Sequence, residues 1–353
     1  MANSPKLPSL DYVAALSDDV GIIQHAVETV PNRSTGYCTD DVARAFMVAL
    51  ARLRLEPRDP HAMQLASTYL AFLHDAQLDD GRFHNFMSYD RRWLDDVGTH
   101  DSCGRALWAI GYGVRFSPNP AWRRVCRRVL DRGIQSLDWL EFIRAKGYAM
   151  LGLAHAVEAN GAPGDRAALR HLGDELHACN VAARDDAWEW FEETMTYDNA
   201  RLPEALLRAG AVLEDASFLD AGLRTLAFYE RVTIEDGTFV PIGNDGWYRR
   251  GGTRARFGQQ PLEAAAMVDA ELAAFAATHA PDRLATAEIA LAWFYGRNSC
   301  GVTMAQGGGC FDGLEASAVN RNMGAESTLA YLAGAYAMAE TRAATLHVAR
   351  GIG

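Results

Sequence analysis

The chain has 353 residues, of which 49% are hydrophobic and 22% charged, and its formal net charge is −11. This composition can bury a large core, while the negative charge repels phosphate backbones and argues against nucleic acid as a partner. We expect no membrane span and no signal peptide, and therefore a cytoplasmic protein whose six cysteines are reduced thiols.

In chain order, two kinds of helical segment alternate. One kind is rich in small residues and apolar on nearly every face, which is typical of helices buried all round. These segments cover residues 40–53, 101–112, 145–158, 198–211, 261–277 and 324–339. The other kind is amphipathic and covers residues 61–76, 121–140, 166–183, 217–232, 281–297 and 341–350, with 18–28 as a further candidate for the last position.

Six such alternations predict an all-α chain in which residues 1–353 form one (α/α)6 barrel. A helical solenoid would give a similar pattern with a more regular period. Here long, aromatic-rich connections precede the buried helices, which favours a closed ring around a site. Because each outer helix runs back, the inner helices are parallel, and their first turns should converge on one bowl.

The first turns of the buried segments carry the residues that we consider for chemistry. We expect Asp41, Asp101, Glu263 and Asp198 to be catalytic, and Asp40, His100, Glu193, Gln260, Asn322 and Glu326 to bind substrate. Capping of the helix start explains Asp, Ser and Thr at such positions equally well. Capping explains Asp41, Glu263 and Glu326 less well, because a carboxylate inside a buried helix needs a partner or a wet cavity.

The connections add aromatic and basic side chains that suit sugars, which present apolar ring faces edged by hydroxyl groups. We expect Trp93, Trp190 and Trp247 to stack on sugar rings and Arg249 and Arg254 to bind substrate. The alternatives are ordinary packing for each tryptophan and a solvated loop for the arginines.

Other chemistries find little support. The chain lacks a Walker loop, a GxGxxG turn, a GxSxG elbow and HExxH. The candidate ligands for a zinc ion are Cys38, Cys103 and His100. The Trp-Cys and Cys-His-Gly motifs of the zinc-dependent peptide cyclases are missing, however. A single Asp-Asp pair is a weak sign of a terpenoid cyclase. We therefore expect no metal and no cofactor.

The strings GYCTDDVARA, DGRFHNFMSYDRRW, HDSCGRALWA and QQPLEAAAMV resemble a bacterial carbohydrate-active (α/α)6 domain found near, or fused behind, glycosyltransferases. The resemblance covers about residues 19–337. More distantly, the chain is similar to six-hairpin glycoside hydrolases and N-acylglucosamine 2-epimerases. The resemblance implies a glycosyltransferase as a neighbour, although this chain carries no glycosyltransferase half.

The leading hypothesis is an inverting glycoside hydrolase that acts on an oligosaccharide. Two carboxylates of the protein, about 6.5–9.5 Å apart, would cleave the glycosidic bond. A phosphorylase would use a related site. A sugar 2-epimerase is the second hypothesis, but it needs two facing histidines, and only His100 and His84 are in place. The third is a non-catalytic carbohydrate-binding barrel that accompanies a glycosyltransferase.

Overall fold

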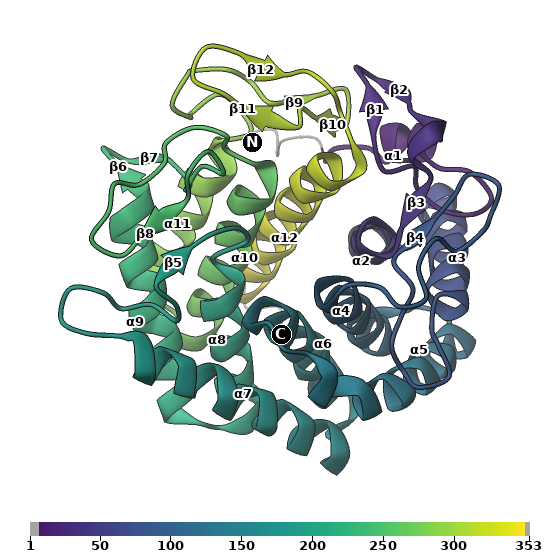
Figure 1. Cartoon of the computed structure of the whole chain (residues 1–353), viewed down its shortest axis with the longest axis horizontal. Helices are drawn as coiled ribbons and strands as arrows, with labels where there is room; N and C mark the ends of the chain where they lie inside the picture. Colours follow the sequence, from purple (N-terminus) through teal and green to yellow (C-terminus); the bar gives the residue numbers. More distant parts are fainter. Residues whose placement is uncertain (1–6, 350–353) are drawn as a thin grey trace.

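A computed structural model describes residues 7–349 of the chain. Within this range, parallel helices form a closed inner ring in which each helix packs against the next and the last packs against the first (Figure 1). The ring consists of α2 (Thr39–Leu55), α4 (His100–Phe116), α6 (Ile143–Asn160), α8 (Arg201–Leu213), α10 (Pro261–Thr278) and α12 (Ala325–Ala349). The predicted (α/α)6 barrel is confirmed.

Amphipathic helices surround this ring, and each packs against the inner helix that precedes it. They are α3 (Pro60–Asp75), α5 (Pro120–Gly133), α7 (Pro163–Ala183), α9 (Ala216–Thr233) and α11 (Pro281–Ala292). Their starts follow directly from the sequence. Asp59 and Asn119 cap α3 and α5, and a proline stands in the first turn of both, where its missing N–H costs nothing.

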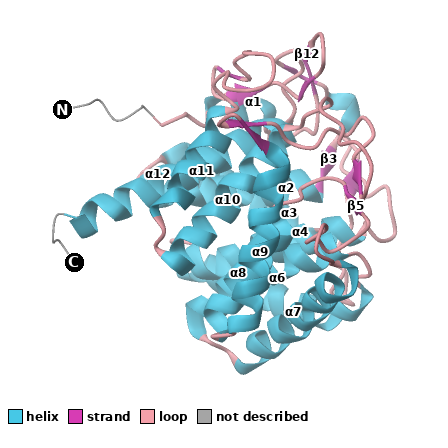
Figure 2. Ribbon diagram, turned by 90° about the vertical axis from the view of Figure 1, so that its left-hand side faces the viewer, coloured by secondary structure: helices cyan, strands magenta, loops and turns pink. Residues whose placement is uncertain are grey.

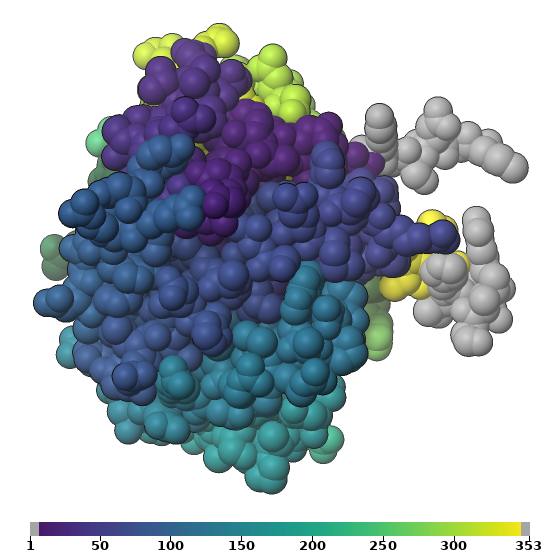
Figure 3. All heavy atoms as spheres, turned by 90° about the vertical axis from the view of Figure 1, so that its right-hand side faces the viewer, coloured from purple at the N-terminus to yellow at the C-terminus, as the bar shows by residue number. Residues whose placement is uncertain are grey.

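The sixth outer position differs from the prediction. Residues 341–349 form no separate helix, because α12 continues unbroken to Ala349, and Arg350 lies outside the described residues. Residues 18–28 are not helical either, and the short helix α1 (Asp11–Leu16) lies against α12 instead. The Tyr12 hydroxyl donates to the Met323 carbonyl at 2.8 Å, so the N-terminal segment is tied to the loop that precedes α12. Figure 3 shows the N-terminal residues, in purple, between the blue spheres of the following segments and the yellow spheres of the C-terminal part.

Every short strand lies in a connection that precedes an inner helix, so the strands gather at one end of the barrel (Figure 2). All pairs are antiparallel. They are β1 (Ala26–Val27) with β2 (Val30–Pro31), β3 (Tyr37–Cys38) with β4 (Phe86–Met87), β5 (Thr194–Met195) with β8 (Tyr248–Arg249), β6 (Ile234–Glu235) with β7 (Thr238–Phe239), β9 (Ala305–Gln306) with β10 (Gly309–Cys310), and β11 (Gly313–Leu314) with β12 (Val319–Asn320). Two of these pairs, β3 with β4 and β5 with β8, join the loops of different helical hairpins, and each of the other four lies within a single loop.

Glycines set the closest contact in the ring, between α4 and α6. A Cβ on Gly111 would meet the carbonyl oxygen of Gly152, and one on Gly152 would meet that of Leu107. The two backbones therefore touch, which larger residues would prevent. None of the described helices is long and apolar enough to cross a membrane. All six cysteines are free thiols.

Candidate functional site

A cavity of about 380 Å³ lies at the end of the barrel where the inner helices begin. We call this cavity the bowl. Its wall comes from the first turns of α2 and α12 and from the loops that precede α10 and α12. Side chains that line it include Asp40, Asp41, Arg44, Gln260, Asp312 and Glu326, together with His25 and Phe86. Four residues singled out in the sequence, Asp40, Asp41, Gln260 and Glu326, thus share one cavity.

Arg44 joins the first and last inner helices at the floor of the bowl. Its Nη1 lies 3.1 Å from Asp41 Oδ1 on the same helix, and its Nη2 lies 2.7 Å from Glu326 Oε2 on α12. The Arg44 side chain is only 12% exposed, so both contacts are shielded from water on the guanidinium side. The pairing fixes Asp41, whose other carboxyl oxygen accepts a hydrogen bond from the Cys38 thiol.

Arg105 on α4 occupies the next place along the ring and is also buried. Its guanidinium lies 3.4 Å from Asp40 Oδ1 and 3.1 Å from Asp198 Oδ2, and it donates to the Tyr148 hydroxyl at 2.6 Å. Tyr148 in turn donates to Asp198 at 2.8 Å. One arginine therefore connects α2, α4, α6 and the loop before α8.

Two adjacent carboxyl groups in the bowl have raised pKa values. Burial raises the pKa of Asp41 to about 6, although the Arg44 charge opposes the rise. Burial also raises the pKa of Asp40, the charges of Asp101 and Glu326 add to the rise, and those of Arg105 and Arg44 oppose it. The Asp40 side chain is 22% exposed, and its buried Oδ1 has no hydrogen-bond partner among the described residues. Asp40 therefore faces the cavity with a carboxyl group whose pKa burial has raised.

Glu263 and Asp198 lie beneath the bowl. Glu263 is 1% exposed and accepts hydrogen bonds from the backbone N–H groups of Asp198 and Asn199 and from the Tyr229 hydroxyl, the last at 2.8 Å. Asp198 has a φ of +48°, which is why α8 begins at Arg201 instead of residue 198. Burial, together with the Asp198 charge, raises the pKa of Glu263 to about 7. Burial opposes ionisation of Asp198, but Arg105 and Arg201 lower its pKa.

Asp101 lies at the start of α4 and is partly exposed. The Tyr197 hydroxyl donates a hydrogen bond to Asp101 Oδ2. Arg144 holds Tyr197 from below, since its Nε donates to the Tyr197 carbonyl at 2.6 Å and its guanidinium lies 5.1 Å from the ring centre. Trp247, also partly exposed, lies on the other side with its ring centre 6.4 Å from that of Tyr197. Asp101 therefore has a fixed position beside an aromatic rim.

The other predicted stacking residues are placed differently. Trp190 is fully buried and packs against Phe191 and Tyr229, so neither face of its ring is open to a sugar, and that prediction is wrong for this structure. Trp93 stacks on His84 at 4.7 Å between ring centres and packs against the core. His100 likewise stacks on Trp139 at 4.0 Å, and its Nδ1 accepts from the Glu141 N–H at 3.4 Å.

The polar residues expected at the rim also have partners within the protein. Arg254 is bound to Glu235 and to the Val240 carbonyl, so its guanidinium stabilises its own loop. Asn322 accepts from the Glu28 N–H at 3.0 Å. Glu193 is exposed and lies 3.1 Å from Arg250, and Arg249 is exposed in β8. The structure gathers none of these four in the wall of the bowl.

Sequence reasoning missed the two arginines that organise the bowl. Arg44 follows Asp41 by three residues and Arg105 follows Asp101 by four, so each lies one helical turn further along the same face as a carboxylate. Spacing alone could have found the contact of Arg44 with Asp41, but Arg105 pairs with Asp40 and Asp198, which its spacing from Asp101 does not indicate. Tyr148 and Tyr197 carry no such signal, because one lies in mid-helix and the other in an irregular loop.

No group of three or more His, Cys, Asp or Glu residues within 7–349 is arranged to hold a metal ion. The zinc set considered from the sequence does not form. Cys38 bonds to Asp41, Cys103 lies against the backbone of Phe83, and His100 stacks on Trp139.

Solved structures with the same fold cover nearly the whole chain. A sugar epimerase from a ruminal bacterium matches with a TM-score of 0.73 at 12% identity, over 94% of this chain and 95% of that one. Cellobiose 2-epimerase from Bacillus thermoamylovorans matches with a TM-score of 0.74 at 11% identity, over 95% and 96%. A GH76 α-mannanase from Bacteroides thetaiotaomicron matches with a TM-score of 0.65 at 10% identity, over 95% of each chain.

No protein-family model matches the chain. No curated protein matches it either. The resemblance to six-hairpin barrel enzymes is thus confirmed for the fold. At such low sequence identities, the matches establish the fold and not the activity.

Proposed function

We propose that the chain is a carbohydrate-active enzyme, and specifically a glycoside hydrolase that works in the bowl. The observation that carries this proposal is the position of Asp40. Its carboxyl group faces the cavity, has a raised pKa, and lies close enough to Asp101 and Glu326 to be affected by their charges. A carboxyl group with a raised pKa beside a second carboxyl group is the arrangement that glycosidic cleavage uses.

In the proposed reaction, Asp40 donates its proton to the glycosidic oxygen as the bond from that oxygen to the anomeric carbon breaks. Asp101 removes a proton from a water molecule, whose oxygen bonds to the anomeric carbon. Tyr197 orients Asp101 through its hydrogen bond. The inverting outcome requires that the water attacks from the face opposite the leaving group. Glu326, which is 41% exposed, is the alternative base.

The roles of the remaining residues follow from their contacts. Asp41 is held by Arg44 and the Cys38 thiol, so we assign it to positioning Arg44 rather than to proton transfer. Glu263 and Asp198 hold the loop before α8, through the contacts described above. Trp247 at the rim and Gln260 in the wall of the bowl are the groups proposed to bind sugar.

The names of the structural neighbours guide the choice of substrates. One neighbour is an α-mannanase and another is a GH9 endoglucanase, which matches with a TM-score of 0.53 over 90% of this chain. Both names denote hydrolysis of glycan chains. We therefore propose an oligosaccharide or polysaccharide as substrate, with α-mannans and β-glucans to be tested first.

The experiment is to incubate the purified chain with α-mannan, cello-oligosaccharides and rhamnosides and to measure released reducing sugar. Asp40→Asn and Asp101→Asn should each lower kcat by about 10²–10⁴-fold with an unchanged fold. Asp220→Asn, in an exposed pair on α9, is the control and should keep full activity. Full activity in both the Asp40 and the Asp101 variant would contradict the assignment. Proton NMR of the first product would give the anomeric outcome.

A sugar 2-epimerase is the second candidate, because one of the matching structures is named a sugar epimerase and another a cellobiose 2-epimerase. His25 lines the bowl and could exchange a proton beside a carbonyl group. Incorporation of deuterium from heavy water at a sugar carbon, without bond cleavage, would favour this candidate. Sugar release that requires inorganic phosphate would indicate a phosphorylase, and tight binding without turnover would indicate a binding module.

A further inference from the structure

A second cavity, of about 310 Å³, lies inside the ring on the other side of Arg44. It runs from Arg44 and Asp198 to Arg54 and Phe116, which are next to last in α2 and last in α4. From Arg44 to Arg54 it follows α2 for ten residues, or roughly 15 Å at 1.5 Å per residue. It therefore extends to the end of the barrel opposite the bowl. Its size falls within the range of small-molecule sites.

Three guanidinium groups meet in the half of this cavity that lies away from the bowl. They belong to Arg54, Arg115 and Arg208, from three different inner helices. Burial lowers the pKa of Arg115, and the charges of Arg208 and Arg54 lower it further, although Glu158 opposes this. Like charges on three neighbouring side chains repel one another, and an anion between them would relieve this repulsion.

The nearby histidine does not add to this charge. His155 lines the same half of the cavity, and burial lowers its pKa to about 4, with the charges of Arg208 and Arg115 contributing. Its ring is packed edge-on against Tyr112 and Phe116. His155 is therefore neutral at pH 7, and the wall there is aromatic between the arginines.

Each acidic side chain that lines the cavity has an arginine partner, although the buried Oε1 of Glu340 has no hydrogen-bond partner among the described residues. Glu340 lies 2.8 Å from Arg54, and Asp269 lies 2.7 Å from Arg201. Glu204 is shared, since one of its oxygens lies 2.6 Å from Arg201 and the other 2.7 Å from Arg208. Asp198, at the bowl end, is paired with Arg105.

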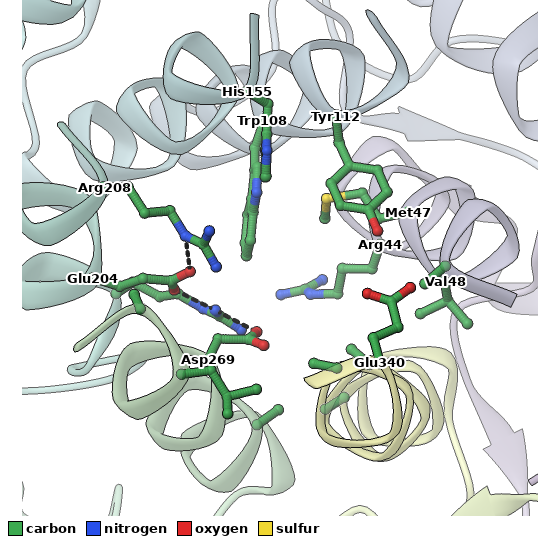
Figure 4. A pocket seen from close by; sticks show the side chains of 18 of the residues that line it. Arg44, Met47, Val48, Trp108, Tyr112, His155, Glu204, Arg208, Asp269 and Glu340 are labelled. Carbon is green, nitrogen blue, oxygen red and sulfur yellow. Dashed lines mark hydrogen bonds and ion pairs between the residues drawn. The ribbon is translucent and has the colours of Figure 1, made fainter. Parts of the chain in front are cut away.

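Arg208 has unused hydrogen-bonding capacity in the cavity. Its Nε donates to Glu204, but its two terminal nitrogens have no partner among the described residues. Figure 4 shows this end of the guanidinium directed into the cavity beside Trp108. The side chain is 29% exposed although it comes from an inner helix, so the cavity itself provides that exposure. A planar fork with free N–H groups binds carboxylate or phosphate well.

We infer that this inner cavity is a second binding site, separate from the bowl, for a small oxyanion held by Arg208 with Arg115 nearby. The shared chemistry is a carboxylate or phosphate group, whose oxygens accept from the free end of Arg208. The aromatic rings of Trp108 and Tyr112 enclose the rest of the site. This inference does not depend on the reaction proposed for the bowl.

The test is calorimetric titration of the chain with inorganic phosphate and, separately, with acetate, against sodium chloride at equal ionic strength. We expect saturable one-to-one binding of at least one oxyanion, which also identifies the preferred class. Arg208→Gln should weaken it at least tenfold, and Arg208→Lys, which keeps the charge but loses the fork, should weaken it less. Arg224→Gln is the matched control, because Arg224 is 32% exposed and lies on an outer helix.

Equal binding by wild type and Arg208→Gln would overturn the inference, as would the absence of saturable binding of either oxyanion. Phosphate also stabilises many proteins because it is excluded from their surface. That effect is not site-specific binding, and it would be the same in wild type and in all variants. Circular dichroism checks that Arg208→Gln is folded. If Arg208→Gln does not fold, oxyanion binding is compared between wild type and Arg208→Lys instead. Asp101→Asn should bind the oxyanion as wild type does. The outcome of the hydrolase proposal can therefore be distinguished from the outcome of the oxyanion-site proposal.

Discussion

Arg44 on α2 and Glu326 on α12 form an ion pair at 2.7 Å, and this pair closes the ring of inner helices at the floor of the bowl. The two residues are 282 positions apart, and the same guanidinium also holds Asp41. It lines the bowl on one side and the inner cavity on the other. One side chain thus separates the two cavities and joins the two ends of the fold.

Arg44→Met should destabilise the fold. The substitution leaves Asp41 buried without its partner, and removing one member of a buried pair costs about 3–5 kcal/mol. We expect the low end of that range, since Glu326 is 41% exposed and can be solvated. Urea unfolding gives the measurement. Arg342→Met, which breaks an exposed pair with Glu288, should cost about 1 kcal/mol or less. Equal losses in the two variants would contradict the role of Arg44.

Glu263 should make stability depend on pH. Its pKa is about 7 in the folded protein and near 4.5 when it is exposed, so the folded state binds a proton more tightly than the unfolded chain. The resulting stability is fully present below about pH 4.5 and is lost as the pH rises to about 7. It is on the order of 3 kcal/mol. Urea unfolding from pH 4 to 8 should be flatter for Glu263→Gln. A curve of unchanged slope would show that Glu263 is not the group responsible, and Glu288→Gln is the exposed control.

Much of the fold was predictable because helical periodicity is a local signal. Buried and amphipathic segments alternate regularly, and the predicted inner helices agree with those observed apart from their ends. The sixth outer position was not predictable in this way. Residues 341–350 were expected to form a separate amphipathic helix, but no helix breaker precedes residue 341, so α12 simply continues to Ala349.

The site was predictable in part, for a geometric reason. Parallel inner helices bring their first turns together, which places Asp40, Asp41 and Glu326 in one cavity. Whether a side chain faces the cavity or lies beneath it depends on packing between distant segments. Glu263 is buried because the backbone of residues 198–199 packs over it and donates hydrogen bonds to its carboxylate. Nothing in the sequence near Glu263 predicts that contact.

Tyr197→Phe should lower activity without loss of the fold. The hydroxyl group donates to Asp101, and a hydrogen bond to a charged group contributes about 1.5–3 kcal/mol, or roughly tenfold to a hundredfold in rate if it acts in the transition state. We expect kcat to fall more than KM changes, because in the proposed reaction Tyr197 orients the base and does not hold the sugar. Tyr295→Phe is the control, as Tyr295 bonds only to Tyr331 away from the bowl. A change in KM alone would assign Tyr197 to substrate binding.

The two tryptophans that sequence analysis treated alike should behave differently. Trp247 is partly exposed at the rim with a φ of +58°, so Trp247→Asn removes the ring and keeps a residue that tolerates this backbone conformation. It should raise KM for an oligosaccharide by roughly twofold to tenfold, as expected for an aromatic contact worth about 0.5–1.5 kcal/mol, and leave unfolding unchanged.

Trp190→Ala should instead cost about 3–5 kcal/mol of stability, because it opens a cavity in the core against Phe191 and Tyr229. Trp190→Phe fills most of that space and should cost less. Thermal unfolding and KM, measured on the same three variants, separate the two roles. If Trp190→Phe raised KM while its Tm stayed at the wild-type value, Trp190 would have to contact the substrate. Its buried position would then not be the one it has when substrate is bound.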